Sequence, residues 1–124
     1  MLRLPDRRLV FQRRTADAPR APGLLGCFGG QVEFDETPLQ AALRELTEET
    51  SIEVARTPLT YLCDLQLAES SRIDQFHIFE ANIHDENFEV FEGDRAEVYA
   101  RGEALDRIDL VPALRQILHN VVKE

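Results

Sequence analysis

Acidic side chains crowd around a single arginine in residues 29–52 of the chain, GGQVEFDETPLQAALRELTEETSI. They form two groups, one at 33–36 and one at 45–49, and the arginine is Arg44. Repulsion between neighbouring carboxylates is costly, so a chain that keeps them usually holds a cation among them. The segment therefore predicts a bound cation.

The second acidic group falls on the clearest helix that the sequence predicts. Thr37 is a good N-cap, Pro38 suits the first helical position, and Gln40 stands where a capping-box partner belongs. Helical spacing predicts a buried stripe. Its members are Leu39, Leu43, Leu46 and Thr50.

The other side of this helix holds the carboxylates that could bind a cation. Glu45 is three residues before Glu48 and four before Glu49, so their side chains are neighbours on the helix surface. Like-charge pairs at these spacings destabilise an isolated helix by a few tenths of a kcal/mol each. The helix therefore brings carboxylates together at a cost that a cation would offset.

Strands are predicted on both sides of this helix, and a second helix ends the chain. Residues 2–4 and 9–14 read as a hairpin, 15–26 as a loop, and 29–34 as a further strand. Residues 59–67 alternate strictly, and one face would hold Leu59, Tyr61, Cys63, Leu65 and Leu67. Two more strands are predicted at 75–83 and 87–93. The final helix spans 108–124, with Leu114, Ile117, Leu118 and Val121 as its apolar stripe. This order favours an α+β or α/β domain with helices packed on a mixed sheet.

Composition excludes several classes of function. The chain has 124 residues, enough for one domain, and its net charge of −9 is unfavourable for binding duplex nucleic acid. Six of the 14 basic residues lie within the first twenty positions. They could form a basic edge that faces the acidic segment, although for most of them we expect a solvated strand edge. Cys27 and Cys63 lack the spacing of a zinc site and suggest buried thiols in a reducing compartment. With no apolar run long enough for a membrane span, we expect a cytoplasmic protein.

The acidic segment resembles the Nudix box of the Nudix hydrolase (MutT-like) family, G-x5-E-x7-R-E-U-x-E-E-x-G-U, where U is a bulky apolar residue. The match begins at Gly30 and ends at Ile52, and eight of the nine defined positions agree. Ser51 stands where the family has glycine, which puts the helix end in doubt without removing a carboxylate. The resemblance implies one Nudix domain over residues 1–124, with a mixed sheet sandwiched between helices. It also implies a longer first strand than this sequence has.

The resemblance further implies hydrolysis of a nucleoside diphosphate linked to a group X, with Mg²⁺ or Mn²⁺ as the cation. Hard oxygen ligands suit these ions. Carried over by position, Glu48 and Glu49 would be the principal ligands, and Glu45 a further ligand or the base. The Gly29 carbonyl would complete the ligand set, and Gly30 would let the backbone approach closely.

Other positions receive supporting roles from the same resemblance. Arg44 would hold the carboxylates in position, and Glu36 would support the junction between loop and helix through an ion pair. Glu92 is the candidate for an additional carboxylate from a later loop, ahead of Glu97. Arg13 or Arg14 would contact substrate phosphate, and the sequence does not choose between them.

The substrate is predicted mainly by elimination. Markers of the ADP-ribose, dinucleoside polyphosphate and NADH subfamilies do not appear, and the stretch where one would stand reads LAES, at 67–70. A minimal domain then favours a nucleoside triphosphate, cleaved to a monophosphate and pyrophosphate. The alternatives are hydrolysis of ADP-ribose or a nucleotide sugar, and a Nudix module that binds a nucleotide without cutting it. A homodimer remains open.

Overall fold

A computed structural model describes residues 1–69 and 72–122 of the chain. The strands are β1 (Leu2–Arg3), β2 (Leu9–Arg13), β3 (Leu25–Gly26), β4 (Leu59–Glu69), β5 (Arg72–Asn82) and β6 (Arg95–Tyr99). The helices are α1 (Pro38–Glu49), α2 (Arg101–Leu105) and α3 (Pro112–Asn120), with a short 3-10 turn, η1 (Val54–Arg56). Within these ranges no helix combines the length and the apolar character needed to cross a membrane.

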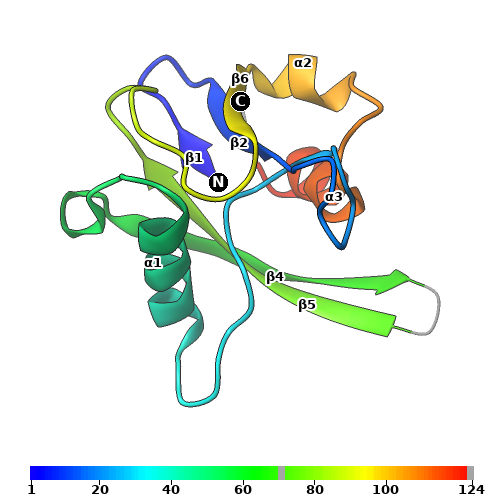
Figure 1. Cartoon of the computed structure of the whole chain (residues 1–124), viewed down its shortest axis with the longest axis horizontal. Coiled ribbons are helices and arrows are strands. Elements are labelled where there is room, and N and C mark those ends of the chain that lie inside the picture. Colours follow the sequence, from blue (N-terminus) through cyan, green and yellow to red (C-terminus); the bar gives the residue numbers. More distant parts are fainter. Residues whose placement is uncertain (70–71, 123–124) are drawn as a thin grey trace.

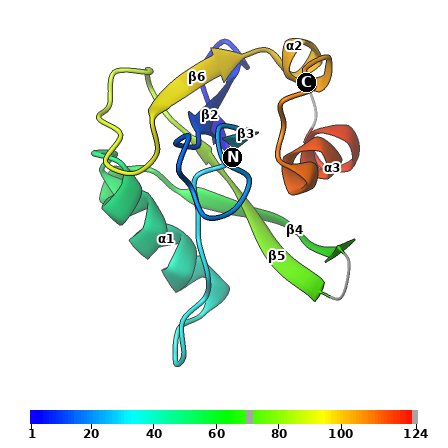
Figure 2. The same ribbon diagram turned by 45° about the vertical axis from the view of Figure 1, so that its right-hand side comes forward.

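The strands form one mixed sheet. Its order is β3-β2-β1-β5-β4, and β6 also pairs with β2. The β1–β5 pair is parallel, whereas the other pairs of named strands are antiparallel. Figures 1 and 2 show α1 and α3 on opposite sides of the strands. The predicted mixed sheet between helices is therefore confirmed.

Two apolar clusters fill the spaces between the sheet and these helices. β2 contributes to both because successive side chains of a strand point to opposite faces. Leu9 and Phe11 join the cluster under α3, and Val10 joins the cluster under α1, which includes Leu46. The sheet thereby fixes the C-terminal half of α1 relative to β2.

The predicted start of α1 is confirmed. The Gln40 N–H donates to Thr37 Oγ1 (3.1 Å), and the Thr37 N–H donates to Gln40 Oε1 (2.8 Å), which completes the capping box. The predicted stripe is correct at Leu46 and Thr50, but it is wrong at Leu39, which is 44% exposed. The first turn of α1 extends away from the sheet, so an apolar residue there lacks a surface to cover it (Figure 1).

Two predicted strands are wrong, and the alternation of a third, which is otherwise confirmed as β4, fails at one position. Residues 31–34 form a loop, and the Gln31 carbonyl accepts a hydrogen bond from the Arg44 side chain instead of a ladder partner. Residues 87–93 contribute only an isolated bridge between Val90 and Thr50, and the strand follows later as β6. In β4 a bulge between Tyr61 and Cys63 breaks the alternation and leaves Tyr61 55% exposed.

The C-terminal region contains one helix more than predicted. The short helix α2 was missed, and α3 ends at Asn120 instead of continuing to the end of the chain. Its stripe is confirmed at Leu114, Ile117 and Leu118, which are buried. Beyond α3, Val122 rather than Val121 is fully buried. The last two residues of the predicted helix, and Ser70 of the LAES stretch, lie outside the described residues.

Candidate active site

Three carboxylates from two distant parts of the chain converge at the C-terminal half of α1. Oxygen atoms of Glu45, Glu49 and Glu92 all lie within 4.8 Å of one another. Glu49 is buried, Glu45 is half-buried and Glu92 is exposed, so the group leads from the interior to the surface. We refer to these residues as the carboxylate cluster.

Glu49 occupies an unusual position for a charged group, because only 1% of its surface is exposed. The Gly29 N–H donates to its Oε2 (3.1 Å), and Gln12 Nε2 donates to its Oε1 (3.1 Å). Burial, together with the neighbouring Glu45 and Glu92 carboxylates, raises the pKa of Glu49 to about 8. Without a cation, the cluster therefore binds a proton in place of one negative charge.

Gly30 packs directly against the Glu45 side chain. A Cβ atom on Gly30 would lie 2.3 Å from Glu45 Oε1, so any other residue would displace that carboxylate. The preceding Gly29 has a φ of +151°, which brings its N–H to Glu49. The glycine pair thus lets the main chain contact the carboxylates of α1.

Arg44 connects the first acidic group to the second. Its Nε and Nη2 donate to the two carboxylate oxygens of Glu36 at 2.8 and 2.9 Å, and its Nη1 donates to Glu45 Oε1 at 2.8 Å. The Arg44 hydrogen bonds hold the pKa of Glu36 at about 2. The ion pair expected at the junction of loop and helix is therefore present, and it anchors one side of Glu45.

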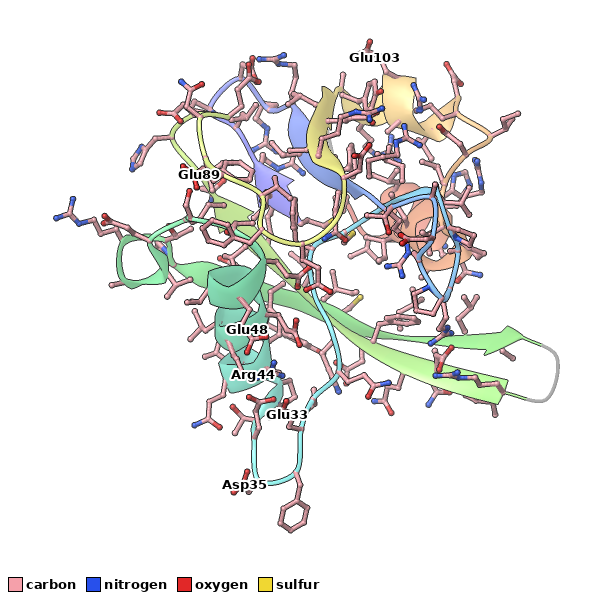
Figure 3. All side chains as sticks on the ribbon, viewed as in Figure 1. Glu33, Asp35, Arg44, Glu48, Glu89 and Glu103 are labelled. Carbon is pink, nitrogen blue, oxygen red and sulfur yellow. The ribbon has the colours of Figure 1, made fainter. Side chains whose placement is uncertain are left out.

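Glu48 lies outside the carboxylate cluster. Its side chain is 56% exposed, and its Oε2 is 3.3 Å from Arg44 Nη1, the same nitrogen that bonds Glu45. In Figure 3 Glu48 and Arg44 lie near each other on α1, with Glu33 of the preceding loop close to Arg44. One guanidinium thus separates Glu48 from the carboxylate cluster.

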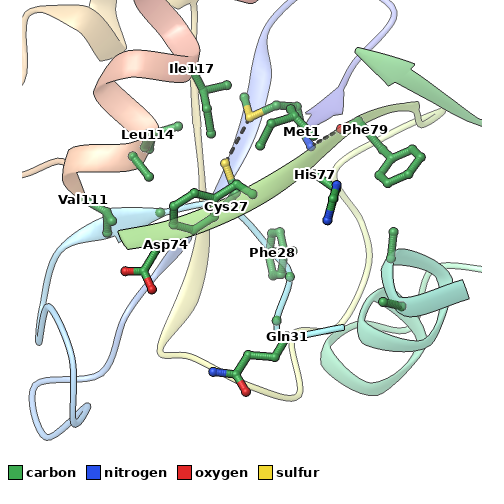
Figure 4. Close-up of a pocket in the computed structure, with 18 of the residues that line it drawn as sticks. Met1, Cys27, Phe28, Gln31, Asp74, His77, Phe79, Val111, Leu114 and Ile117 are labelled. Atoms are coloured by element: carbon green, nitrogen blue, oxygen red, sulfur yellow. Dashed lines mark hydrogen bonds between the residues drawn. The ribbon is translucent and has the colours of Figure 1, made fainter. Parts of the chain in front are cut away.

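A cavity of about 700 Å³ opens beside Gly29 and Gly30. Residues of α1, β5 and the start of α3 line it, together with the segment from Gly26 to Val32. Figure 4 shows Phe28, His77 and Phe79 at this cavity. His77 also lines the cavity, and its Nδ1 lies 2.7 Å from Asp64 Oδ1. The arrangement offers aromatic surface next to a group of oxygen ligands.

Comparisons with known proteins identify the family. The model of the NUDIX domain matches residues 1–121. The chain belongs to the NUDIX family. No curated protein matches it in sequence.

Solved structures with the NUDIX fold resemble the chain over nearly its whole length. DR0079 from Deinococcus radiodurans has a TM-score of 0.84 at 20% identity, covering 98% of this chain and 79% of that chain. The MutT protein from Methanosarcina mazei Go1 has a TM-score of 0.83 at 16% identity, covering 96% and 86%. The E. coli ORF135 protein has a TM-score of 0.72 at 28% identity, covering 95% and 82%. At these identities the first two establish the fold alone.

Within this NUDIX domain the two arginines considered for substrate binding have different surroundings. Arg13 is buried in β2, where its Nε and Nη2 each lie 2.7 Å from a Glu97 oxygen and its Nη1 lies 2.9 Å from Asp109 Oδ2. Its guanidinium and the Glu97 carboxylate therefore satisfy each other. Arg14 lines the cavity, and its Nε donates to the Arg20 carbonyl (2.8 Å). This geometry favours Arg14 as the residue facing a ligand.

Sequence reasoning missed Gln12, which links the two parts of the site. It is 5% exposed on β2, and its Nε2 donates to Glu49 Oε1 (3.1 Å) and to the Glu92 carbonyl (2.7 Å). Gly93 makes room for it, since a Cβ there would lie 2.8 Å from Gln12 Cγ, and Gly93 has a φ of +96°. An amide that directly follows the apolar run of residues 9–11 in a buried strand was the available signal.

Proposed function

We propose that this NUDIX protein hydrolyses the pyrophosphate bond of a nucleoside diphosphate linked to X, with Mg²⁺ or Mn²⁺ as cofactor. The proposed substrate is a nucleoside triphosphate, which would be cleaved to a monophosphate and pyrophosphate. The observation that carries the proposal is the convergence of Glu45, Glu49 and Glu92 within 4.8 Å, beside a cavity that borders Gly29 and Gly30.

The chemistry of the donor set fits a hard divalent cation. Every donor in the carboxylate cluster is a carboxylate oxygen, the ligand type that Mg²⁺ and Mn²⁺ prefer. The pKa of Glu49 is raised first by burial and then by repulsion from the Glu45 and Glu92 carboxylates. Arg44 contacts Glu45, whereas the hydrogen-bond donors to Glu49 are the neutral groups of Gly29 and Gln12. A buried acidic cluster that served only folding would be expected to carry a paired cation instead.

We assign ion binding to Glu45, Glu49 and Glu92, together with the carbonyl of Gly29. Glu48 stays in the proposed ligand set, because its side chain is exposed and shares Arg44 Nη1 with Glu45, one turn earlier on α1. When bound, the ion would polarise phosphoryl oxygens and lower the pKa of water.

The remaining residues would orient the carboxylates and neutralise the charge of the substrate phosphate. Glu45 is a further ligand or takes the proton from the attacking water, and its contact with Arg44 fixes the orientation that either role needs. Glu36 supports Arg44 from the loop. Arg14 is the proposed phosphate contact at the cavity, and Gly30 allows the substrate and the carboxylates to approach the main chain.

A second candidate substrate class is ADP-ribose or a nucleotide sugar. The cavity of about 700 Å³ falls in the range of pockets that hold drug-sized ligands and could admit a two-part molecule. Proteins of similar fold differ in the compound that they cleave or bind. One is the E. coli dihydroneopterin triphosphate pyrophosphohydrolase, at 19% identity. The NUDIX domain of Shewanella oneidensis NrtR, at 18% identity, was solved in complex with ADP ribose.

The test is a hydrolysis screen of the purified protein with and without Mg²⁺. The panel contains nucleoside triphosphates, ADP-ribose, nucleotide sugars and dinucleoside polyphosphates, with products separated by anion exchange. We expect Glu49→Gln to lower turnover at least about 100-fold, since the loss of an outer-shell partner alone commonly lowers activity 10- to 100-fold. Glu53→Gln, at a glutamate that directly precedes η1 and whose side chain is 71% exposed, is the matched control and should keep full activity.

The outcome of this screen separates the candidate functions. Release of monophosphate and pyrophosphate from a triphosphate supports the proposal, and preference for ADP-ribose or a nucleotide sugar supports the second candidate. Nucleotide binding without turnover anywhere in the panel would contradict both and favour a binding module.

A further inference from the structure

The loop that carries Glu92 is held against the end of α1. This Glu92 loop, residues 83–94, joins β5 to β6. Val90 forms an isolated bridge with Thr50, and the Phe91 N–H donates to the Glu49 carbonyl (2.7 Å). Figure 1 shows the loop passing the C-terminal end of α1. The position of the Glu92 carboxylate therefore depends on a small set of contacts with α1 and its neighbours.

Ser51 makes two of these contacts, both with the main chain of Glu89. The Ser51 N–H donates to the Glu89 carbonyl (3.0 Å), and Ser51 Oγ accepts a hydrogen bond from the Glu89 N–H (2.8 Å). A glycine, the residue that the Nudix box has at this position, could make only the first contact. The hydroxyl therefore adds a contact to the loop that the usual box residue cannot supply.

The backbone conformation explains why a serine fits at this position. Helices often end with a residue in the left-handed region, where glycine is favoured. Here Thr50, the residue that follows α1, has an extended conformation, with φ −143° and ψ 166°. Ser51 is not among the non-glycine residues of positive φ, which are Arg7, Ala21 and Asp35 in the described part of the chain. Position 51 can therefore hold a side chain without strain.

A second contact holds the loop on the other side of Glu92. Gln12 Nε2 donates to the Glu92 carbonyl (2.7 Å) from β2. Glu92 thus lies between the Ser51 contact at Glu89 and the Gln12 contact at its own carbonyl. Loss of either contact would let the carboxylate move away from Glu45 and Glu49.

We propose that Ser51 is a positioning residue, whose hydroxyl holds the Glu92 loop so that the Glu92 carboxylate stays beside Glu45 and Glu49. The role in binding a divalent cation rests on the proposed function. The contact between Ser51 and the loop does not, so the two claims can fail separately.

The contact is tested in the metal-free protein by backbone amide hydrogen exchange. Ser51→Ala removes the hydroxyl without introducing the flexibility of glycine, and Ser51→Thr keeps a hydroxyl. We expect exchange at the Glu89 amide to become roughly 3- to 10-fold faster in Ser51→Ala, the range expected for one lost hydrogen bond, and to be restored in Ser51→Thr. Equal exchange in wild type and Ser51→Ala would overturn the proposal.

Thr47→Ala is the matched control. Thr47 is an exposed hydroxyl residue of α1, and its Oγ1 donates to the Leu43 carbonyl within the helix (2.9 Å). Its loss should leave the Glu89 amide unchanged. An equal acceleration in Thr47→Ala would mean that the helix as a whole, and not the Ser51 hydroxyl, holds the loop.

The effect on the ion site is tested by Mn²⁺ titration followed by electron paramagnetic resonance. We expect Ser51→Ala to weaken Mn²⁺ binding roughly 3- to 10-fold, and to cause no further loss in a Glu92→Gln background. Equal losses in both backgrounds would show that Ser51 does not act through Glu92. If wild type binds no Mn²⁺, the proposed function fails, while the exchange experiment still decides whether Ser51 holds the loop.

Discussion

The molecule contains two clusters of charged side chains with buried members, and the charges are combined in opposite ways in the two. The carboxylate cluster brings like charges together, and burial with this repulsion raises the pKa of Glu49 to about 8. The second cluster, which we call the paired cluster, joins Arg13 to Glu97 and Asp109, and Arg13 holds the pKa of Glu97 at about 2. Neighbouring residues of β2 contact the two clusters: Gln12 donates a hydrogen bond to Glu49, and Arg13 pairs with Glu97.

The difference indicates which cluster is available for chemistry. In the paired cluster each buried charge already has its partner, so an added ligand would have to displace an ion pair. In the carboxylate cluster Arg44 pairs with Glu45, but Glu49 has only the neutral donors of Gly29 and Gln12, so its charge would be balanced by a proton or an added cation. Unbalanced buried charge is costly to folding, and it is therefore a stronger sign of a functional site than buried charge as such.

The largest effect on stability is expected in the paired cluster. Arg13→Ala would leave Glu97 without its main partner at a site where both side chains are 11–12% exposed. Breaking such a pair by removing one partner commonly costs about 3–5 kcal/mol of unfolding free energy. Denaturant unfolding followed by circular dichroism measures the loss. Arg95→Ala is the control: that side chain is 60% exposed beside the same Glu97, and its loss should cost less than about 1 kcal/mol. Similar losses in the two variants would contradict the distinction.

In the carboxylate cluster a substitution is expected to increase the unfolding free energy instead of lowering it. Glu49→Gln removes a repelled charge, while its single amide oxygen can still accept one of the two hydrogen bonds that Gly29 and Gln12 donate to the carboxylate oxygens. At pH 9 and without divalent cations, we expect the variant to be more stable than wild type by on the order of 1 kcal/mol. The same unfolding experiment measures this gain. A loss of stability at that pH would mean that the Glu49 charge already has a partner within the protein.

The two clusters should also make the stability of the metal-free protein fall in two separate pH ranges, an alkaline limb and an acid limb. Because the folded-state pKa of Glu49 is raised from 4.5 to about 8, its contribution to stability is complete below pH 4.5 and is lost as the pH rises through 8. The pKa of Glu97 is lowered from 4.5 to about 2, so its contribution is present above pH 4.5 and is lost as the pH falls through 2. We expect Glu49→Gln to flatten only the alkaline limb and Glu97→Gln only the acid limb. Loss of both limbs in one variant would contradict separate clusters.

The smallest effect is expected at the outer edge of the paired cluster. Arg107 binds Asp109 through two hydrogen bonds of 2.9 Å, and its guanidinium carbon lies 4.6 Å from the Tyr99 ring centroid. Its side chain is 32% exposed, so solvent weakens both interactions. Arg107→Gln should therefore lower the unfolding free energy by about 0.5–1 kcal/mol. A loss as large as that of Arg13→Ala would extend the buried part of the paired cluster to Arg107.

The features that sequence could predict are those set by local rules. Thr37 and Gln40 predict the start of α1 because a capping box involves only residues three apart. The proximity of the Glu45 and Glu49 side chains follows from helical spacing alone. The family resemblance added Glu92 as a candidate, although nothing in the acidic turn around it distinguishes it from surface.

The features that sequence could not predict depend on contacts between distant segments. β6 was missed because one of its inward residues is Glu97, whose burial is possible only through Arg13, 84 positions away. Residues 87–93 alternate like a strand, yet Ser51 and Glu49 bind this segment to the end of α1. The contacts of Gln12 with Glu49 and Glu92 span 37 and 80 positions, beyond any local pattern.

The most direct test of the account is the effect of Mg²⁺ on thermal unfolding at pH 8, compared between wild type and Glu49→Gln. A ligand that binds only the folded protein raises the melting temperature with its concentration. If the carboxylate cluster binds a divalent cation, millimolar Mg²⁺ should raise the melting temperature of wild type and leave that of Glu49→Gln nearly unchanged. Equal shifts in the two proteins, or no shift in wild type up to saturating Mg²⁺ and Mn²⁺, would contradict the account.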